Sequence, residues 1–183
     1  MTFYLETEHL ILRDILPTDM DGIFELDSNP KVHQYLGKNP ITTKTQAETI
    51  INFIIEQYNE RGIGRFAAIE KSSGNFIGWS GLKFNTGDKE TLGSKRDFYD
   101  IGYRLIPKYW GKGYAKESAQ AVLDFGFDNL KLDLICGAAE IGNIASNKIL
   151  QNIGLQYHEQ FTYEGELINW YELKNQDYAK TMS

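Results

Sequence analysis

The sequence predicts a mixed α/β domain whose sheet is mostly antiparallel. The first observation is the order of elements: one strand, two or three helices, three strands, a helix, a strand, a helix and two strands. Helices interleaved in this way are typical of a mixed domain, not of a doubly wound one. The second is composition, because 183 residues with 42% hydrophobic and 13% aromatic side chains suffice for one core. No repeat or linker interrupts the chain, so we expect a single domain over residues 1–183.

The first elements are a strand and two short helices. Apolar and polar residues alternate over Leu5–Leu16, which predicts an edge strand. Thr18 followed by Asp21 resembles a capping box, and the helix that it starts should end near Leu26. Pro30 then favours another helical turn, because proline is pre-organised for the first helical position.

A longer helix and a hairpin come next. Thr45 with Glu48 is a second capping-box candidate, and the isoleucine-rich stripe behind it predicts a helix that ends near Gly62. Strand signals over 66–70 and 76–84 flank a Ser-Ser-Gly-Asn turn, which predicts a hairpin. The polar residues after it are expected to form a loop.

The last third predicts a strand, a short helix and a final hairpin. Leu132, Leu134 and Cys136 alternate as in a buried strand, and 143–151 should be helical. Strands over 155–163 and 167–173 are joined by a Glu-Gly-Glu turn. Cys136 is expected to be a small core residue and not a nucleophile.

A strand, a glycine turn and a helix stand between these halves. Tyr99–Ile106 is rich in aromatic and β-branched residues, and Pro107 should end that strand. Apolar residues recur at helical spacing over 115–128. The connecting Trp-Gly-Lys-Gly-Tyr-Ala, residues 110–115, brings backbone N–H groups to a helix start, where an anion is favoured. Residues 95–116 carry six basic and two acidic side chains, a net charge of +4, whereas the whole chain carries −6. The turn therefore predicts a phosphate-binding site, with an ordinary solvated loop as the alternative.

Composition narrows the function. No apolar run approaches a membrane span, and no basic start precedes an apolar stretch, so we expect neither membrane insertion nor a secretion signal. A single cysteine forbids an internal disulfide, which favours a cytoplasmic protein. Three scattered histidines offer no metal-ligand spacing. The acidic balance argues against general nucleic-acid binding.

Four sequence pieces stand in a specific order and spacing. They are Leu10–Arg13 with Pro17–Asp19, Ile101–Tyr103 with Pro107, Trp110–Ala115 with Glu117, and Asn143-x-x-Ser146 with Ile153–Leu155. Together they resemble the GNAT superfamily of acyl-CoA-dependent N-acetyltransferases, and most nearly the branch that acetylates the N-termini of ribosomal proteins. The resemblance covers Leu5 to about Leu173. It departs from the superfamily at the first residue of the glycine turn, where Trp110 stands in place of the usual Arg or Gln.

The resemblance implies a fold and a co-substrate. The fold would be a mostly antiparallel sheet of about seven strands flanked by helices and splayed between the fourth and fifth strands. The co-substrate would be acetyl-CoA, with no metal. Its pantetheine arm would pair with backbone groups of the fourth strand, and its pyrophosphate would rest on the glycine turn. The implied binding residues are Leu105, Ile106, Trp110, Gly111, Lys112, Gly113, Tyr114, Ala115, Lys116 and Asn143.

The resemblance also implies catalytic candidates for direct transfer to an amine. Ser146 matches a serine that can protonate the departing thiolate, and its alternative is a helix hydroxyl bonded to the preceding turn. Asp100 is one candidate base, although it could equally pair with Arg104 or a lysine. Glu164 is a second candidate, with an ordinary turn glutamate as the favoured alternative. A backbone N–H near Leu105 would bind the oxyanion.

The expected partner is an amine acceptor, either a peptide N-terminus or a small amine. Residues 159–177 carry a net charge of −4, which would attract a cationic amine. We expect a monomer or homodimer. The alternative function is a non-catalytic acyl-CoA-binding sensor or scaffold domain with the same fold.

Two other enzyme classes fit poorly. A nicotinamide-binding turn would need a third glycine where Lys116 stands. A serine hydrolase elbow around Ser80 would need a glycine at Leu82.

Overall fold

Eight strands form one sheet in the computed structural model, which describes residues 3–181. Their hydrogen-bonded order is β1-β2-β3-β4-β5-β6-β8-β7. The mixed α/β class is confirmed, and the helical turn predicted after Pro30 is the 3-10 helix η2. The strands are β1 (Tyr4–Glu6), β2 (Leu10–Asp14), β3 (Arg65–Glu70), β4 (Phe76–Asn85), β5 (Phe98–Leu105), β6 (Leu134–Glu140), β7 (Gln156–Tyr163) and β8 (Glu166–Lys174). The helices are η1 (Pro17–Asp19), α1 (Met20–Asp27), η2 (Val32–Tyr35), α2 (Lys44–Arg61), η3 (Asp88–Glu90), η4 (Pro107–Tyr109), α3 (Tyr114–Asp128), α4 (Ile144–Asn152) and α5 (Asn175–Thr181).

The chain divides into two compact units. The first unit holds the described residues up to Gly81 together with Gly102–Ala121. The second holds Leu82–Ile101 and the described residues from Val122 onward. β5 and β6 run parallel and pair at Asp100 and Cys136, whereas the ladders of β1–β2, β2–β3, β3–β4, β6–β8 and β7–β8 are antiparallel. The single domain over residues 1–183 stays a prediction.

The predicted first strand is broken in two, which gives eight strands instead of about seven. Thr7 interrupts Leu5–Leu16: its backbone N–H donates to the Leu10 carbonyl at 2.9 Å, and the Leu10 N–H donates to Thr7 Oγ1 at 3.0 Å. A threonine that bonds to nearby backbone offers the chain a turn in place of a continuous ladder. The result is the β1–β2 hairpin.

The first helix does not start with the predicted Thr18–Asp21 box. Instead the 3-10 helix η1 leads into α1, and the Asp19 side chain caps the start of η1, because its Oδ2 accepts the Leu16 N–H at 2.8 Å. The same carboxylate is held by both terminal nitrogens of Arg13, at 2.7 and 2.8 Å. A bidentate guanidinium pair fixes the acceptor in place, so the neighbouring Thr18 is not needed as a cap.

The box predicted for α2, Thr45 with Glu48, is also wrong, by two residues. Thr43 caps the helix: its Oγ1 accepts the Gln46 N–H at 3.3 Å, and Gln46 Oε1 accepts the Thr43 N–H at 3.0 Å. Glutamine serves as well as glutamate in this reciprocal pattern. The predicted end is confirmed, because Gly62 takes the left-handed conformation at φ +69°.

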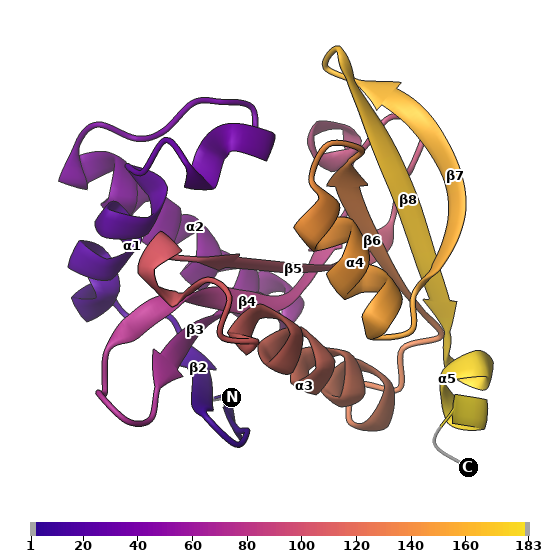
Figure 1. Ribbon diagram of the computed structural model, residues 1–183, viewed down its shortest axis with the longest axis horizontal. Coiled ribbons are helices and arrows are strands. Elements are labelled where there is room, and N and C mark those ends of the chain that lie inside the picture. Colours follow the sequence, from indigo (N-terminus) through magenta and orange to yellow (C-terminus); the bar gives the residue numbers. More distant parts are fainter. Residues whose placement is uncertain (1–2, 182–183) are drawn as a thin grey trace. The chain divides into compact units, whose positions relative to one another are not determined.

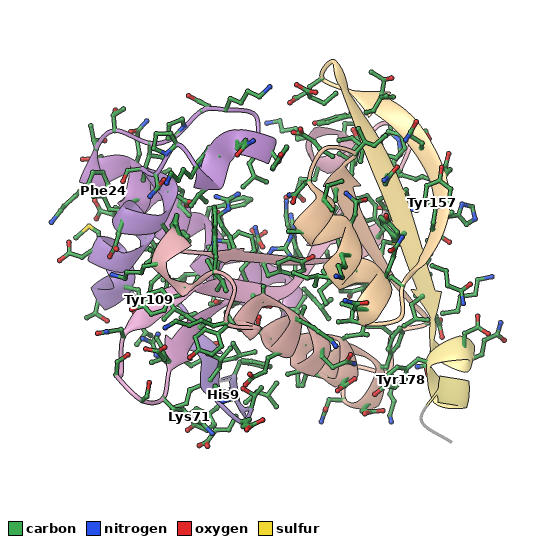
Figure 2. The ribbon with its side chains drawn as sticks, viewed as in Figure 1. His9, Phe24, Lys71, Tyr109, Tyr157 and Tyr178 are labelled. Atoms are coloured by element: carbon green, nitrogen blue, oxygen red, sulfur yellow. The ribbon has the colours of Figure 1, made fainter. Side chains whose placement is uncertain are left out.

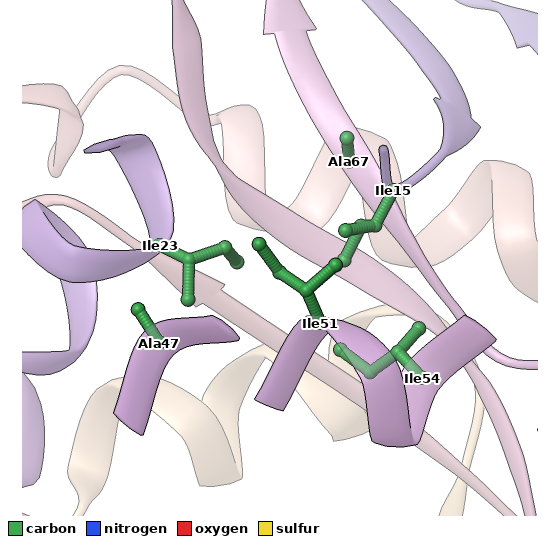
Figure 3. Packing of buried hydrophobic residues seen from close by; sticks show 6 residues of the cluster. All are labelled: Ile15, Ile23, Ala47, Ile51, Ile54 and Ala67. Carbon is green, nitrogen blue, oxygen red and sulfur yellow. The ribbon is translucent and has the colours of Figure 1, made fainter. Parts of the chain in front are cut away.

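The core of the first unit lies where α1 and α2 pack on the sheet (Figures 1 and 3). Burial of each large aliphatic side chain there is worth about 1.5–3 kcal/mol. Because isoleucine is stiff and branched, it fills the space between a helix and a pleated sheet with little loss of rotamer freedom. The cluster consists of Ile15, Ile23, Ala47, Ile51, Ile54 and Ala67.

Two hairpins confirm the predicted turns. Gly74 joins β3 to β4 at φ +71°, and Glu164 and Gly165 join β7 to β8 at φ +50° and +85°. Two successive positive φ values suit the right-handed twist of a tight hairpin.

The second unit contains a second core, the 3-10 helix η3 within the predicted loop, and the unpredicted helix α5. Trp170 meets Phe98 edge to face at 5.0 Å beside buried Cys136. α4 lies against β6, where a Cβ on Gly137 would come within 2.6 Å of Leu150, so glycine permits the close approach (Figure 1). The unpredicted α5 is held by Tyr178, whose hydroxyl lies 3.0 Å from Asp124 Oδ1.

Candidate acetyl-CoA site

The turn between β5 and α3 lies within the first unit and has the geometry of an anion cradle. Pro107 starts the short helix η4, and the chain then passes through Gly111 at φ +75° and Gly113 at φ +86°. The first helical bond of α3 runs from the Glu117 N–H to the Gly113 carbonyl at 3.0 Å. The N–H groups of residues 114–116 therefore have no partner within the helix, as at any helix start.

Nothing in the described protein fills the space over this turn. A Cβ added at Gly111 or Gly113 would meet no atom within 4 Å, and both residues are exposed. Unpaired helix-start N–H groups facing open space suit a diphosphate. The residues present therefore fit a diphosphate such as that of acetyl-CoA, and the binding itself stays a prediction.

A carboxylate that the sequence analysis missed holds the side chains beside the turn. Glu70, at the end of β3, accepts the Tyr114 hydroxyl at 2.9 Å and lies 3.5 Å from Lys112 Nζ. The Lys112 ammonium also lies over the rings of Tyr109 and Tyr114, at 5.2 and 5.6 Å (Figure 2 labels Tyr109). Hydrogen bonds from Ser73 and Tyr114, helped by the Lys112 charge, keep the pKa of Glu70 below its usual value. The charge of Lys112 is therefore partly neutralised by Glu70, and the two tyrosine rings help to hold its side chain in place.

The backbone hydrogen bonds at the end of β5 limit which groups could pair with the pantetheine arm. Ile106 and Leu105 are both buried, and the Ile106 N–H already donates to the Ile77 carbonyl at 2.9 Å. Successive N–H groups of a strand point to opposite sides, so the Leu105 N–H points away from β4. The predicted oxyanion donor, the Leu105 N–H, is therefore on the edge of β5 that faces away from β4.

In the second unit, Asn143 and Ser146 meet at the start of α4. Asn143 Oδ1 accepts the Ser146 N–H at 3.1 Å, so Asn143 is the N-cap residue of α4. Its contact with the CoA arm stays a prediction, as does the acid role of Ser146.

Asn147, next to this pair, is a buried polar residue whose role the sequence analysis missed. It is buried, its amide donates to the Glu140 and Asn143 carbonyls at 2.8 Å, and its oxygen accepts from Asn169 and Tyr171. All the hydrogen-bonding capacity of the amide is used within the fold, which indicates that Asn147 positions α4.

The two candidate bases, Asp100 and Glu164, lie far apart in the second unit. Asp100 accepts the Asn85 amide at 2.7 Å and pairs with Cys136, which in turn pairs with Glu172 of β8. Glu164 lies at the far end of β8, in the hairpin turn. The strand between them spans roughly 20 Å, so at most one of them can reach a given amine.

Cys136 is a core residue, as predicted. It is 1% exposed, and burial together with the charges of Glu172 and Asp100 raises the pKa of its thiol to about 12. A thiol that remains protonated at neutral pH is a poor nucleophile.

A buried ion pair was also missed by sequence reasoning. Asp27, 1% exposed at the end of α1, accepts from Arg104 of β5 at 2.5 Å. The Arg104 guanidinium lies 5.1 Å from the Trp79 ring, and that of Arg65 lies 5.2 Å from the same ring. Arg104, which the sequence offered as a partner for Asp100, thus pairs with Asp27.

The start of α3 is tied to the first hairpin through Glu117. Its carboxylate accepts from the Thr7 hydroxyl and the His9 N–H, at 2.5 and 2.8 Å, and lies 2.9 Å from His9 Nδ1. The His9 carbonyl accepts the Lys71 N–H at 2.9 Å, which brings the β3–β4 turn to the same place (Figure 2). Two distant turns therefore support the helix that carries the glycine turn.

This tie gives a pH-dependent prediction. The hydrogen bond to Glu117 raises the pKa of His9 above its ordinary value. The contribution of the pair to stability is thus fully present below the unfolded pKa of about 6.5 and is lost as pH rises through the folded pKa. We expect Glu117→Gln to lower the pKa of His9 in an NMR titration. An unchanged His9 curve would contradict the contact.

The family of the chain follows from one match. The profile of the acetyltransferase (GNAT) domain matches residues 9–156. The chain belongs to the GNAT acetyltransferase family. As a member, this acetyltransferase is an acyltransferase, and the family's general activity is the acetylation of amines with acetyl-CoA as co-substrate.

Relatives and solved structures agree with this assignment. An uncharacterized N-acetyltransferase p20 of Bacillus licheniformis is 35% identical over 152 residues, which cover 83% of this chain and 82% of that protein. An FsC-acetyl coenzyme A-N(2)-transacetylase of Aspergillus fumigatus is 27% identical, covering 86% of this chain and 66% of that protein. The crystal structure of a GNAT-family acetyltransferase from Bacillus anthracis has a TM-score of 0.77 at 23% identity, over 95% of this chain and 99% of that one. A ribosomal-protein-S5-alanine acetyltransferase from Vibrio fischeri has a TM-score of 0.75 at 19% identity, over 96% and 98%.

Two further features of the acetyltransferase concern metals and membranes. Among residues 3–181, no group of three or more His, Cys, Asp or Glu side chains is arranged to hold a metal ion. None of the helices within that range is long and apolar enough to cross a membrane.

Proposed function

We propose that this acetyltransferase moves the acetyl group from acetyl-CoA directly to a primary amine, with both substrates bound at once. The observation that carries the proposal is the exposed turn at residues 111–115, with two glycines at positive φ and open space above them. In this proposal the N–H groups of that turn bind the pyrophosphate, Lys112 and Lys116 add positive charge, and Asn143 contacts the pantetheine arm. The family match over most of the chain supports these assignments.

The chemistry needs three services from the protein. A base removes a proton from the ammonium, so that nitrogen can attack the thioester carbonyl and form the N–C bond. The Leu105 N–H stabilises the oxyanion while the C–S bond breaks. As the intermediate collapses, the nitrogen loses its second proton to solvent, and Ser146 gives a proton to the departing thiolate and regains one from solvent. No covalent enzyme intermediate is required.

The acceptor that we propose is a cationic primary amine, either a peptide N-terminus or a small amine. The acidic balance of residues 159–177 supports attraction of a cation. In that segment Glu159 pairs with Lys95 and Glu172 accepts the Trp170 indole N–H, whereas Glu164 is exposed at the hairpin tip. The names of the Vibrio and Aspergillus proteins point to different acceptors, and both accord with transfer to an amine.

Calorimetry and a thiol-release assay test the proposal together. Acetyl-CoA should bind the purified protein with a measurable heat, and free CoA thiol should appear in the presence of at least one amine from a panel of N-terminal peptides and polyamines. Absence of binding at millimolar acetyl-CoA would overturn the proposed site. Binding and thermal stabilisation without turnover for any amine would instead favour the sensor or scaffold alternative.

Ser146→Ala is expected to lower kcat by about 10- to 100-fold while the affinity for acetyl-CoA changes less than twofold. The reason is that proton donation matters as the C–S bond breaks and not in binding. Steady-state kinetics with calorimetry measure both quantities. Ser146→Thr keeps a hydroxyl and should retain more activity. A Ser146→Ala enzyme with unchanged kcat would remove the acid role.

Asp100→Asn and Glu164→Gln are expected to behave differently in a pH–rate profile. Because Asp100 on β5 and Glu164 in the β7–β8 turn are far apart, only the variant that lacks the true base should lose the acidic limb of kcat/KM. Each variant serves as the control for the other. If both profiles match the parent enzyme, the proton leaves through water.

A further inference from the structure

Trp110 makes an unusual bond for a half-exposed aromatic residue. Its side chain stands at the first position of the glycine turn, 48% of the residue is exposed, and its Nε1–H donates to the Leu105 carbonyl at 2.7 Å. Because half of the residue is exposed, burial stabilises the orientation of the ring only weakly, and the indole hydrogen bond adds a direct constraint on that orientation.

The indole bond completes a closed turn. The Tyr109 N–H donates to the Ile106 carbonyl at 2.9 Å, and the Trp110 N–H donates to the Pro107 carbonyl at 3.1 Å. With the indole bond, three hydrogen bonds join residues 105–107, at and just after the end of β5, to residues 109 and 110. The path by which the chain enters the glycine turn is therefore set by Trp110.

The same bond decides which backbone groups β5 offers. The Leu105 carbonyl is occupied by the indole, and the Ile106 N–H is occupied by Ile77. The Leu105 N–H, which points away from β4, is then the group left for a bound thioester. A carbonyl oxygen has two lone pairs and the indole takes one of them, so a pantetheine arm that paired with Leu105 would have to share its carbonyl with Trp110.

We propose that Trp110 is a positioning residue for acetyl-CoA. Its indole N–H holds the turn in the form that binds the diphosphate, and it keeps the Leu105 carbonyl occupied while the co-substrate is bound. This inference rests on the proposed acetyl-CoA site. A neutral indole adds no charge, so its contribution is to fix the backbone, whereas Lys112 and Lys116 supply the attraction.

Trp110→Phe tests the proposal, because it removes the N–H and keeps a ring. By calorimetry the dissociation constant for acetyl-CoA should rise about three- to tenfold, which corresponds to one ordinary hydrogen bond. KM for acetyl-CoA should rise by the same factor with kcat unchanged, since the bond is present before and during the reaction. Tyr4→Phe is the matched control: it also removes an exposed aromatic donor, the hydroxyl that bonds Glu6, and should leave both constants unchanged.

An NMR measurement gives a readout that does not depend on activity. The Nε1–H resonance of Trp110 is assigned by its absence in Trp110→Phe. Its slow exchange with solvent should persist when acetyl-CoA is saturating. Loss of that protection on binding, or equal or tighter binding by Trp110→Phe, would overturn the inference. Failure of the parent protein to bind acetyl-CoA would overturn the proposed site itself.

Discussion

Gly113→Asp is expected to reduce the affinity for acetyl-CoA by at least about a hundredfold. The new carboxylate would project from a turn where a Cβ meets no protein atom within 4 Å, into the space assigned to the diphosphate. Two like charges about 4 Å apart near a protein surface repel by roughly 4 kcal/mol, and each 1.4 kcal/mol is a tenfold change in affinity. Isothermal titration calorimetry measures the loss directly.

Two variants separate charge from backbone strain in that experiment. Gly113→Asn places a neutral side chain of the same shape at φ +86° and should lose far less affinity than Gly113→Asp. Gly62→Asp puts the same carboxylate at another open, positive-φ position, the end of α2, and should bind acetyl-CoA normally. Equal affinity of the Asp and Asn variants at Gly113 would contradict an anion at this turn.

Asp27→Asn is expected to lower the free energy of unfolding by about 3–5 kcal/mol. The change leaves the Arg104 guanidinium, 20% exposed, without its charged partner in the first unit. Breaking one side of a buried ion pair costs this much because the remaining charge stays desolvated. For a chain of this length the midpoint of thermal unfolding should fall by about 10 °C or more, measured by circular dichroism.

Glu25→Gln, on the same helix, is the matched control for Asp27→Asn. Glu25 pairs with Lys108 at 2.9 Å, but both side chains are at least half exposed. Exposed pairs contribute little, so the melting temperature should hardly change. If the two variants melted together, the Asp27–Arg104 pair would have no special role in stability.

Local patterns in the sequence predicted the glycine turn after β5 and both hairpins well. Pro107, Gly111 and Gly113 act through their own backbone preferences, and these depend on neighbours within a few residues. Gly74 and Gly165 were readable for the same reason. Helix starts were less accurate, because several Ser, Thr and Asp residues compete to be the cap and tertiary contacts choose among them.

The residues that the sequence did not reveal act through long-range contacts. Asp27 and Arg104 lie 77 positions apart, and Glu70 lies 44 positions from Tyr114. Asn147 looked like an ordinary polar residue within a short helix, yet its side chain bonds to Tyr171. Pairings of this kind follow from the order of strands in the sheet, which no local pattern encodes.

Domain trimming is where the β6–β8 ladder has a practical consequence. A recombinant fragment cut to the family match, residues 9–156, would lack Thr7 and its bond to Glu117. It would also lack β8, which pairs with β6 along its full length, from Leu134 opposite Lys174 to Glu140 opposite Ile168. The exposed edge of β6 would then promote aggregation, because its unpaired backbone groups can pair with another molecule. Expression and truncation studies should therefore retain both ends of the chain beyond the recognised segment.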